Sequence, residues 1–377
     1  MFRTVRSLWG GFDVYLVAAA VLLSLLGLAT MYSYQGSNFF FERQILWLGI
    51  SLVLMLVFML PDYRFLRSGN AAFLLYVLAV LSLIAVVIFG DVALGAQRRF
   101  DLGIFSFQPS EPAKIALIIL LAKYFSKRHE FIGEIRHIII SGLYAFLIFG
   151  LVFIQPDFGS AMILFFIWLT VVVVAGMKWK HIVLVFLLGA LSFLALWNVG
   201  FQDYQKARVV TFLDPLSDIQ GAGYNAYQST IAVGSGQVWG KGIGYGTQSK
   251  LQFLPEYETD FIFAAFAEEW GLVGVLLLFS LFSVVVGRLL WHAMQAATNF
   301  ERLFITGAAV FIATHFFVHV GMNIGYLPVT GLTIPFMSYG GTHLITEFVL
   351  LGMVMSMCRY AQVPYKESTL PIVEDYH

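Results

Sequence analysis

The chain has 377 residues, no formal net charge, 59% hydrophobic residues and only 12% charged residues. Soluble domains carry about 25% charged residues, so this composition excludes an ordinary soluble domain and indicates a membrane protein, while the lack of net charge gives no support for nucleic-acid binding. The single cysteine, Cys358, excludes an internal disulfide and a thiolate metal site.

Ten apolar runs, each bounded by charged residues, Pro or Gly, predict membrane-spanning helices, because about 20 helical residues cross ~30 Å of hydrocarbon. They cover residues 12–34, 45–60, 71–89, 111–125, 138–154, 160–175, 182–200, 261–287, 303–324 and 342–358. The first run lacks an evident cleavage site of small residues, so we interpret it as a retained helix and not as a secretory signal. The fourth run is short and has the weakest support from hydropathy. The chain is therefore expected to be an all-α polytopic membrane protein, with one membrane domain over residues 1–377.

Lys and Arg residues set the predicted orientation, because cationic loops are retained in the cytoplasm. With the N-terminus inside, most of the 22 Lys and Arg residues fall on the cytoplasmic side. Most exceptions gather at Arg98 and Arg99 and in residues 206–250. Both termini are then cytoplasmic, and the polar tail of residues 361–377 is expected to be disordered.

The one long connection, residues 201–260, lies outside the membrane in this topology, between the seventh and eighth spans. Loops of this length are usually functional or disordered. Aromatic residues such as Tyr204, Tyr227 and Trp239 are interleaved throughout the segment. We therefore expect a partly ordered extracytoplasmic loop that packs back onto the helices.

Two features of the chain have plain structural interpretations. The glycine-rich part of the long loop has Ser235 and Gly242 where a Walker phosphate loop needs Gly and Ser or Thr. Its glycines are expected to permit tight turns, and backbone amides that approach a ligand phosphate are the alternative. His315 and His319 share one helix face. A zinc site would need a third ligand, so we favour an interior face that is hydrogen-bonded across the bundle.

The segment FSFQPSEPAK opens the fourth span. Ser110 is a predicted N-cap, and Glu111 complements the positive end of the helix dipole. Lys114 lies one turn later, so the two charged side chains are expected to pair at i, i+3. Ionisable residues at a lipid boundary are costly and mark cavities or substrate paths, which favours a functional role for this pair over a purely structural one.

Asp260 stands at the start of the eighth span, after Glu256 and Glu258. It is either the cap of that helix or a general base at a water-filled opening. At least one of Glu268 and Glu269 must face the interior, because two carboxylates in lipid would be intolerable. The sequence assigns no hydrogen-bond donor to these two residues or to Glu347.

Five long segments, in order, resemble the SEDS family (shape, elongation, division and sporulation) over nearly the whole chain. They are GAQRRFDLGIFSFQPSEPAK, QPDFGSA, RVVTFLDPLSDIQGAGYNAYQS, GSGQVWGKGIGYGTQSKLQFLPEYETDFIFAAFAEEWGLVG and GMNIGYLPVTGLTIPFMSYGG. Two stretches within them, GTQSKLQFLPE and GMNIGYLPVTG, are closest to the branch that acts in cell elongation and rod-shape maintenance.

The resemblance implies a multi-pass enzyme of the bacterial inner membrane that polymerises lipid II, the undecaprenyl-diphosphate-linked disaccharide peptide, into glycan strands of peptidoglycan. It also implies a partner, a class B penicillin-binding protein that crosslinks the strands. The acidic residue of the family's TDF motif is the catalytic candidate, here Asp260. Positions that match family motifs for substrate binding are Arg98, Glu111, Lys114, Arg208, Lys241 and Gln248. Arg99, Pro112 and His343 depart from the family pattern.

The implied reaction needs a carboxylate to take the proton of the acceptor hydroxyl and cations to stabilise the departing diphosphate. One displacement with one base predicts inversion at the anomeric carbon, by analogy with inverting glycosidases. A divalent cation, Mg²⁺ or Mn²⁺, would fit the diphosphate, and no organic cofactor is expected. The alternative function is a lipid II flippase or transporter, which would need polar groups through the full membrane thickness, whereas the predicted charges collect at the outer surface.

Overall fold

The computed structural model describes residues 11–33, 39–93, 96–101, 103, 106–128, 134–199, 206, 209–212, 223–251 and 253–360. Arg208, the tail of residues 361–377 and part of the predicted loop of residues 201–260 lie outside the described residues. The expectations for them therefore remain predictions.

Eight helices are long and apolar enough to cross a membrane. They are α2 (Val14–Tyr32), α3 (Phe39–Phe58), α5 (Ala71–Phe89), α7 (Ile135–Ile154), α8 (Phe158–Ala175), α13 (Ile262–Met294), α14 (Asn299–Asn323) and α15 (Gly341–Tyr360). The two other predicted spans are also helical, as α6 (Ser110–Ser126) and α9 (Trp179–Val199). The prediction of a polytopic helical membrane protein is confirmed. Three shorter helices are α4 (Phe65–Ser68), α11 (Tyr224–Ser235) and α12 (Thr247–Lys250).

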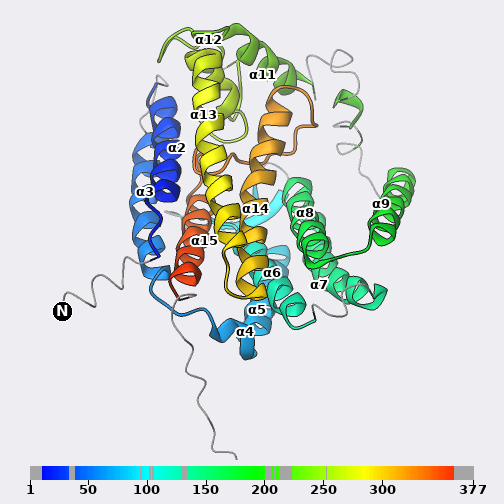
Figure 1. Ribbon diagram of the computed structural model, residues 1–377. Helices are drawn as coiled ribbons and strands as arrows, with labels where there is room; N and C mark the ends of the chain where they lie inside the picture. The colour runs from blue at the N-terminus through cyan, green and yellow to red at the C-terminus, as the bar shows by residue number, and fades with distance from the viewer. Residues whose placement is uncertain are drawn as a thin grey trace, which may run out of the picture.

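The core lies around α14 and α6, which are the most buried helices together with α15 (Figure 1). α14 packs against α6, α8 and α13, and α15 packs against α3. Small residues allow close contact: a Cβ added to Gly352 of α15 would lie 2.4 Å from the Met55 carbonyl oxygen of α3. α9 stands apart from the other helices in Figure 1 and exposes apolar side chains.

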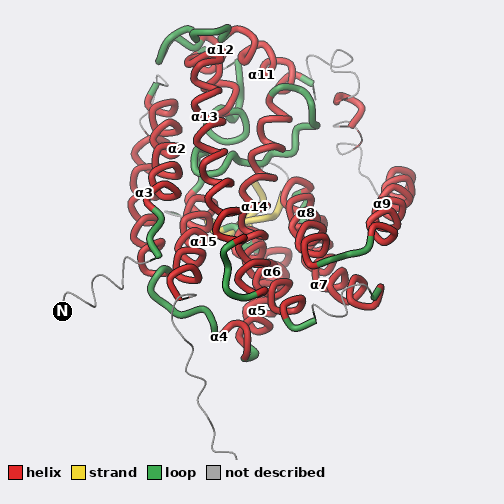
Figure 2. The backbone as a smooth tube through the Cα atoms, viewed as in Figure 1, coloured by secondary structure: helices red, strands yellow, loops and turns green. Residues whose placement is uncertain are grey.

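A small sheet that hydropathy did not predict precedes α6 (Figure 2). Strands β1 (Asp91–Ala93), β2 (Ala96–Asp101) and β3 (Ser106–Phe107) pair antiparallel in the order β1-β2-β3. Asp91 pairs with Arg99, and the Asp101 N–H donates to the Asp91 carboxylate at 2.7 Å. The Thr342 hydroxyl of α15 donates to the Ser106 carbonyl at 2.7 Å. The sheet is thereby fastened to the start of α15.

α13 is broken at Gly271, whose backbone is in a non-helical conformation with φ 65°. The glycine-rich segment that follows α11 docks at this break: the Leu272 N–H donates to the Gln237 carbonyl at 2.9 Å, and the Lys241 N–H donates to the Glu268 carbonyl at 2.9 Å. A Cβ added to Gly240 would lie 2.1 Å from the Glu269 carbonyl oxygen. The glycines therefore serve tight turns and close backbone approach.

Candidate functional site

A cavity of about 440 Å³ opens at one end of the helix bundle. Its lining comes from the start of α3, the β2 to α6 segment, the first turns of α8 and α15, and the segments that precede α13 and α15. The predicted topology places every one of these segments on the outer side of the membrane. The cavity is therefore an outer-side cavity in that topology.

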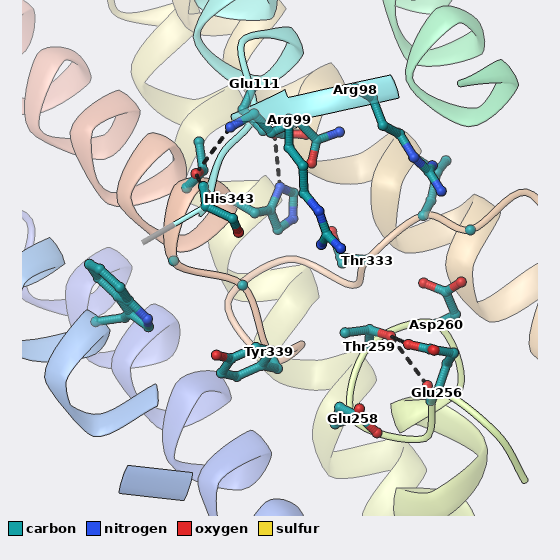
Figure 3. A pocket seen from close by; sticks show the side chains of 18 of the residues that line it. Arg98, Arg99, Glu111, Glu256, Glu258, Thr259, Asp260, Thr333, Tyr339 and His343 are labelled. Atoms are coloured by element: carbon teal, nitrogen blue, oxygen red, sulfur yellow. Dashed lines mark hydrogen bonds and ion pairs between the residues drawn. The ribbon is translucent and has the colours of Figure 1, made fainter. Parts of the chain in front are cut away.

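Opposite charges line two edges of the outer cavity (Figure 3). Arg98 and Arg99 extend from β2 on one edge, and Arg43 of α3 also lines the cavity. Glu256, Glu258 and Asp260 form the other edge, on the turn that leads into α13. In Figure 3 the guanidinium groups of β2 and the Asp260 carboxylate face the same space. Such a cavity can hold a ligand that carries both a phosphate group and a hydroxyl whose proton a carboxylate can take.

Hydrogen bonds fix the acidic edge. The Phe261 N–H donates to the Glu256 carbonyl at 3.1 Å, which closes the turn, and the Tyr339 N–H donates to the Glu258 carbonyl at 2.9 Å. The Ser338 hydroxyl donates to the Thr259 carbonyl at 2.8 Å. The turn is thus attached to the segment that precedes α15, which itself lines the cavity.

Asp260 does not cap α13, which was the structural alternative to a functional role. The helix begins at Ile262 and its N-cap is Phe261. The side chain of Asp260 is half-buried and lines the cavity. This position is compatible with a proton acceptor at the edge of a partly desolvated space.

The predicted pair of Glu111 and Lys114 is confirmed, with Nζ 2.7 Å from Oε1. Glu111 reaches the cavity, whereas Lys114 is fully buried and does not line it. His343 Nδ1 lies 2.9 Å from Glu111 Oε2, and His343 Nε2 lies 2.8 Å from Glu347 Oε1. His343 thus lies between the Glu111 and Glu347 carboxylates. Glu347 also accepts from the Phe336 N–H at 2.8 Å.

This buried network has the spacing of a metal site but already contains a cation. Ligand atoms of Glu111, His315 and His343 lie within 4.8 Å of one another. However, the Lys114 ammonium contacts two of these three residues, at 2.7 Å from Glu111 and 3.1 Å from His315 Nε2. The donor set therefore suits the Lys114 ammonium and does not fit an added divalent cation. His319 donates across the bundle instead, to the Leu332 carbonyl at 2.7 Å.

Lys241 and Gln248, which match family motif positions for substrate binding, do not line the outer cavity. The Lys241 ammonium lies 2.7 Å from Glu268 Oε1, and the Gln248 N–H donates to the same carboxylate at 3.1 Å. Glu269 accepts from the Ser33 hydroxyl at 2.6 Å and from the Gly244 N–H at 3.0 Å. Glu268 and Glu269, which had no donor assigned from the sequence, thus hold the glycine-rich segment on α13. Lys241 is paired with Glu268 in that contact.

The predicted N-cap at Ser110 is wrong by one residue. α6 starts at Ser110 itself, with Pro109 at the N-cap. Pro112 lies in the first turn, as expected for a residue without a backbone N–H. Gln108, just before the helix, donates from Nε2 to the Asp157 carboxylate at 3.2 Å, and Asp157 in turn caps α8 by accepting from the Ser160 N–H.

Several cavity residues were not assigned a role from the sequence. His343 and Arg99 were noted there as departures from a family pattern, and both line the cavity. Gln108 and Asp157 lie within the motif segments FSFQPSEPAK and QPDFGSA but were given no role, and Arg43, Trp47 and Thr342 lie outside the quoted motifs. A folded arrangement, and not a local motif, brings them together.

A second cavity of about 280 Å³ lies at the opposite, inner end of the predicted topology, lined by residues before α2 and near the ends of α13 and α15. Asp13 is almost fully buried there. Its carboxylate accepts from Arg288 Nε at 2.7 Å and lies 2.7 Å from His292 Nε2. It also caps α2 through the N–H groups of Tyr15 and Leu16. No residue lines both cavities among those that the structure describes.

The chain matches a family model described as cell cycle protein, which covers FtsW, RodA and SpoVE, over residues 6–363. The peptidoglycan glycosyltransferase MrdB of Escherichia coli strain K12 is 42% identical over 316 residues, which cover 84% of this chain and 85% of MrdB. Stage V sporulation protein E of Bacillus subtilis strain 168 is 33% identical over 360 residues, which cover 93% of this chain and 98% of that protein.

Solved structures agree with the sequence relatives. The crystal structure of the rod shape determining protein RodA of Thermus thermophilus superposes with a TM-score of 0.71 at 30% identity, covering 93% of this chain and 98% of RodA. A chain from a study of structural coordination of polymerization and crosslinking by a peptidoglycan synthase complex superposes with a TM-score of 0.81 at 31% identity. That superposition covers 94% of this chain and 99% of the other.

Proposed function

Because this chain belongs to the FtsW, RodA and SpoVE family, the SEDS proteins, we propose that it is a peptidoglycan glycosyltransferase that polymerises glycan strands from lipid II in the outer cavity. Its work belongs to cell elongation and rod-shape maintenance. It acts from the inner membrane with both termini in the cytoplasm, beside a class B penicillin-binding protein that crosslinks the strands. The relatives named glycosyltransferases, which include MrdB at 42% identity, support this activity.

The observation that carries the proposal is the position of Asp260 across the cavity from Arg98 and Arg99 (Figure 3). Asp260 takes the proton of the acceptor sugar hydroxyl as that oxygen bonds to the anomeric carbon of the donor. The bond from this carbon to the diphosphate oxygen breaks, and the lipid diphosphate leaves with the electron pair. A single displacement of this kind inverts the anomeric centre.

The basic edge of the cavity suits the leaving group. Arg98, Arg99 and Arg43 present guanidinium groups, which bind phosphate oxygens through two parallel hydrogen bonds. The first residues of α15, Gly341 and Thr342, also line the cavity, and a helix N-terminus favours an anion. Stabilising the diphosphate as its charge develops is the largest contribution that these groups can make to the rate.

A divalent cation, Mg²⁺ or Mn²⁺, would supply further stabilisation of the diphosphate charge. Glu256 and Glu258 are the carboxylates near Asp260 that would contact it, with the phosphate oxygens as its main ligands. No organic cofactor is needed, since the displacement involves no electron transfer.

The separation of the two cavities supports polymerisation over lipid transport. A flippase needs a polar path across the membrane. The outer cavity and the inner cavity have different linings in the described chain, and the proposed reaction groups all belong to the outer one.

The test is polymerisation of purified lipid II by wild type and by Asp260→Asn, each with the partner transpeptidase and at equal folded amounts. Glu42→Gln, an exposed carboxylate at the start of α3 outside the cavity, is the matched control. Wild type and the control are expected to yield long glycan and Asp260→Asn none. Equal polymer from Asp260→Asn would remove Asp260 from its role, and lipid movement across vesicles without polymer would replace the polymerase with a flippase.

A further inference from the structure

Asn323, the last residue of α14, is fully buried and contacts the turn that carries Asp260. Its Nδ2 donates to the Asp260 carbonyl at 3.0 Å and to the His319 carbonyl at 2.8 Å. Its Oδ1 accepts from the Ala264 N–H at 3.2 Å. Both amide hydrogens and the amide oxygen are therefore used.

These contacts interrupt α13 at a defined point. The Asp260 carbonyl and the Ala264 N–H are four residues apart, so they would bond to each other if the helix continued toward the N-terminus. The amide of Asn323 lies between them and satisfies both. Phe261 at the N-cap has no side-chain oxygen, and Asn323 supplies the missing cap from another helix. Asp260 is thereby held outside the helix.

Only one orientation of the Asn323 amide fits. If oxygen and nitrogen exchanged places, the oxygen would face the carbonyls of Asp260 and His319, and the nitrogen would face the Ala264 N–H. Each of the three contacts would become repulsive. The amide is therefore a rigid bridge between the end of α14 and the start of α13.

A third element joins at the same residue. The Ser229 hydroxyl, fully buried on α11, donates to the Asn323 carbonyl at 2.8 Å and lies 3.3 Å from Oδ1. α11 belongs to the extracytoplasmic segment between α9 and α13. α11 is thus connected to the backbone of Asp260 through one buried residue, Asn323, whose main-chain carbonyl accepts from Ser229 and whose side-chain amide donates to Asp260.

We infer that Asn323 is a positioning residue that fixes where the Asp260 carboxylate lies in the outer cavity, and that Ser229 connects this position to α11. The inference rests on the proposed function, because it takes Asp260 as the base. Without the Asn323 amide, the Asp260 carbonyl is free to bond to the Ala264 N–H, and α13 extends by one residue. The carboxylate then moves relative to the acceptor hydroxyl, and displacements of about 1 Å cost roughly 100-fold in rate.

The experiment compares kcat and KM for lipid II polymerisation in four variants, at equal folded amounts and with the partner transpeptidase present. Asn323→Leu removes the bridge at similar volume, and Ser229→Ala removes only the α11 contact. Gln155→Leu is the matched control, since Gln155 is also a buried amide, donates to the Leu83 carbonyl at 3.1 Å and lies outside the outer cavity. Asp260→Asn tests the proposed function in the same assay.

Asn323→Leu is expected to lower kcat by about 100-fold with KM changed less than about 3-fold, and Ser229→Ala to lower kcat less. Gln155→Leu is expected to match wild-type kcat per folded molecule even where its melting temperature falls. A wild-type kcat in Asn323→Leu would overturn the inference, and so would an equal loss of kcat in Gln155→Leu. If Asp260→Asn is inactive in the same assay, the proposed function still stands. Active Asp260→Asn would instead reject the proposed function.

If Asn323→Leu does not fold, the kcat of Ser229→Ala tests the link between α11 and Asp260. A kcat below that of wild type at unchanged KM supports the link to α11, and wild-type kcat rejects it.

Discussion

The ammonium group of Lys114 lies 2.7 Å from the Glu111 carboxylate, and both side chains are buried; Glu111 lines the outer cavity and Lys114 does not. Through His343, whose ring nitrogens lie 2.9 Å from Glu111 and 2.8 Å from Glu347, this pair continues to Glu347 inside the bundle. Removing one partner of a buried pair leaves an uncompensated charge, whereas removing both leaves none. The stability of the fold therefore depends on having both partners of the pair present, and losing one partner alone costs more than losing both.

Glu111→Gln is expected to lower the free energy of unfolding by about 3–5 kcal/mol, because the buried Lys114 then lacks its counter-charge. The double variant Glu111→Gln with Lys114→Met is expected to recover part of that loss. Thermal unfolding in one detergent, compared across the single and double variants, measures both effects.

Asp62→Asn provides the control for that measurement. Asp62 pairs with Arg64 at 2.7 Å, but both side chains are partly exposed, so this change is expected to cost less than about 1 kcal/mol. A double variant at positions 111 and 114 that is less stable than either single variant would contradict the account of the network.

Arg98→Gln and Arg99→Gln are each expected to raise the KM for lipid II by about 10- to 100-fold, since a hydrogen bond to a charged group contributes about 1.5–3 kcal/mol. Arg128→Gln is the control, because Arg128 stacks on Tyr124 beyond the end of α6, away from the cavity. Steady-state kinetics with lipid II give the KM values. Unchanged KM and unchanged kcat in both cavity variants would mean that the diphosphate binds elsewhere.

Gly240→Ala is expected to destabilise the fold strongly. Gly240 has φ 77°, and a Cβ there would lie 2.1 Å from the Glu269 carbonyl oxygen, so the glycine-rich segment could no longer dock on α13. Gly49→Ala, in the interior of α3 with no atom within 4 Å of the added Cβ, is expected to be neutral or slightly stabilising. Melting temperatures that fall equally in both variants would refute the docking described for this segment.

The stability of the protein should depend on pH through Glu258. Burial raises the pKa of the Glu258 carboxyl above its usual value of 4.5, and the Glu256 carboxylate raises this pKa further. A carboxyl whose pKa is raised by folding stabilises the fold below its unfolded pKa, and this contribution is lost as the pH rises through the folded pKa. Glu258→Gln has no such loss.

Relative to wild type, Glu258→Gln is therefore expected to gain stability as the pH rises from about 4.5 toward neutrality. Melting temperatures of both proteins over that range measure the difference. A difference that stays constant with pH would show that Glu258 does not titrate in this way.

Hydropathy and helical spacing predicted much of the fold. All ten predicted spans are helical in the structure, eight of them long and apolar enough to cross a membrane, and the i, i+3 spacing of Glu111 and Lys114 predicted their contact. Both are local properties of the chain, decided within a few turns. The cationic loops likewise assigned to one side of the membrane every segment that lines the outer cavity.

Contacts between distant segments could not be read in the same way. Lys241 precedes its partner Glu268 by 27 residues, and the break of α13 at Gly271 brings them together. The strands of the small sheet have only 3, 6 and 2 residues, too few for a hydropathy signal, and the contact of Thr342 with Ser106 comes from a distant helix. Asn323 was visible only as part of a motif, because its role depends on two other helices.

The most direct measurement is a structure of Asp260→Asn bound to lipid II. We expect the introduced carboxamide to lie within about 3.2 Å of the acceptor hydroxyl and the donor diphosphate to contact Arg98 and Arg99. A diphosphate remote from both Arg98 and Arg99, or an acceptor sugar remote from position 260, would contradict this expectation.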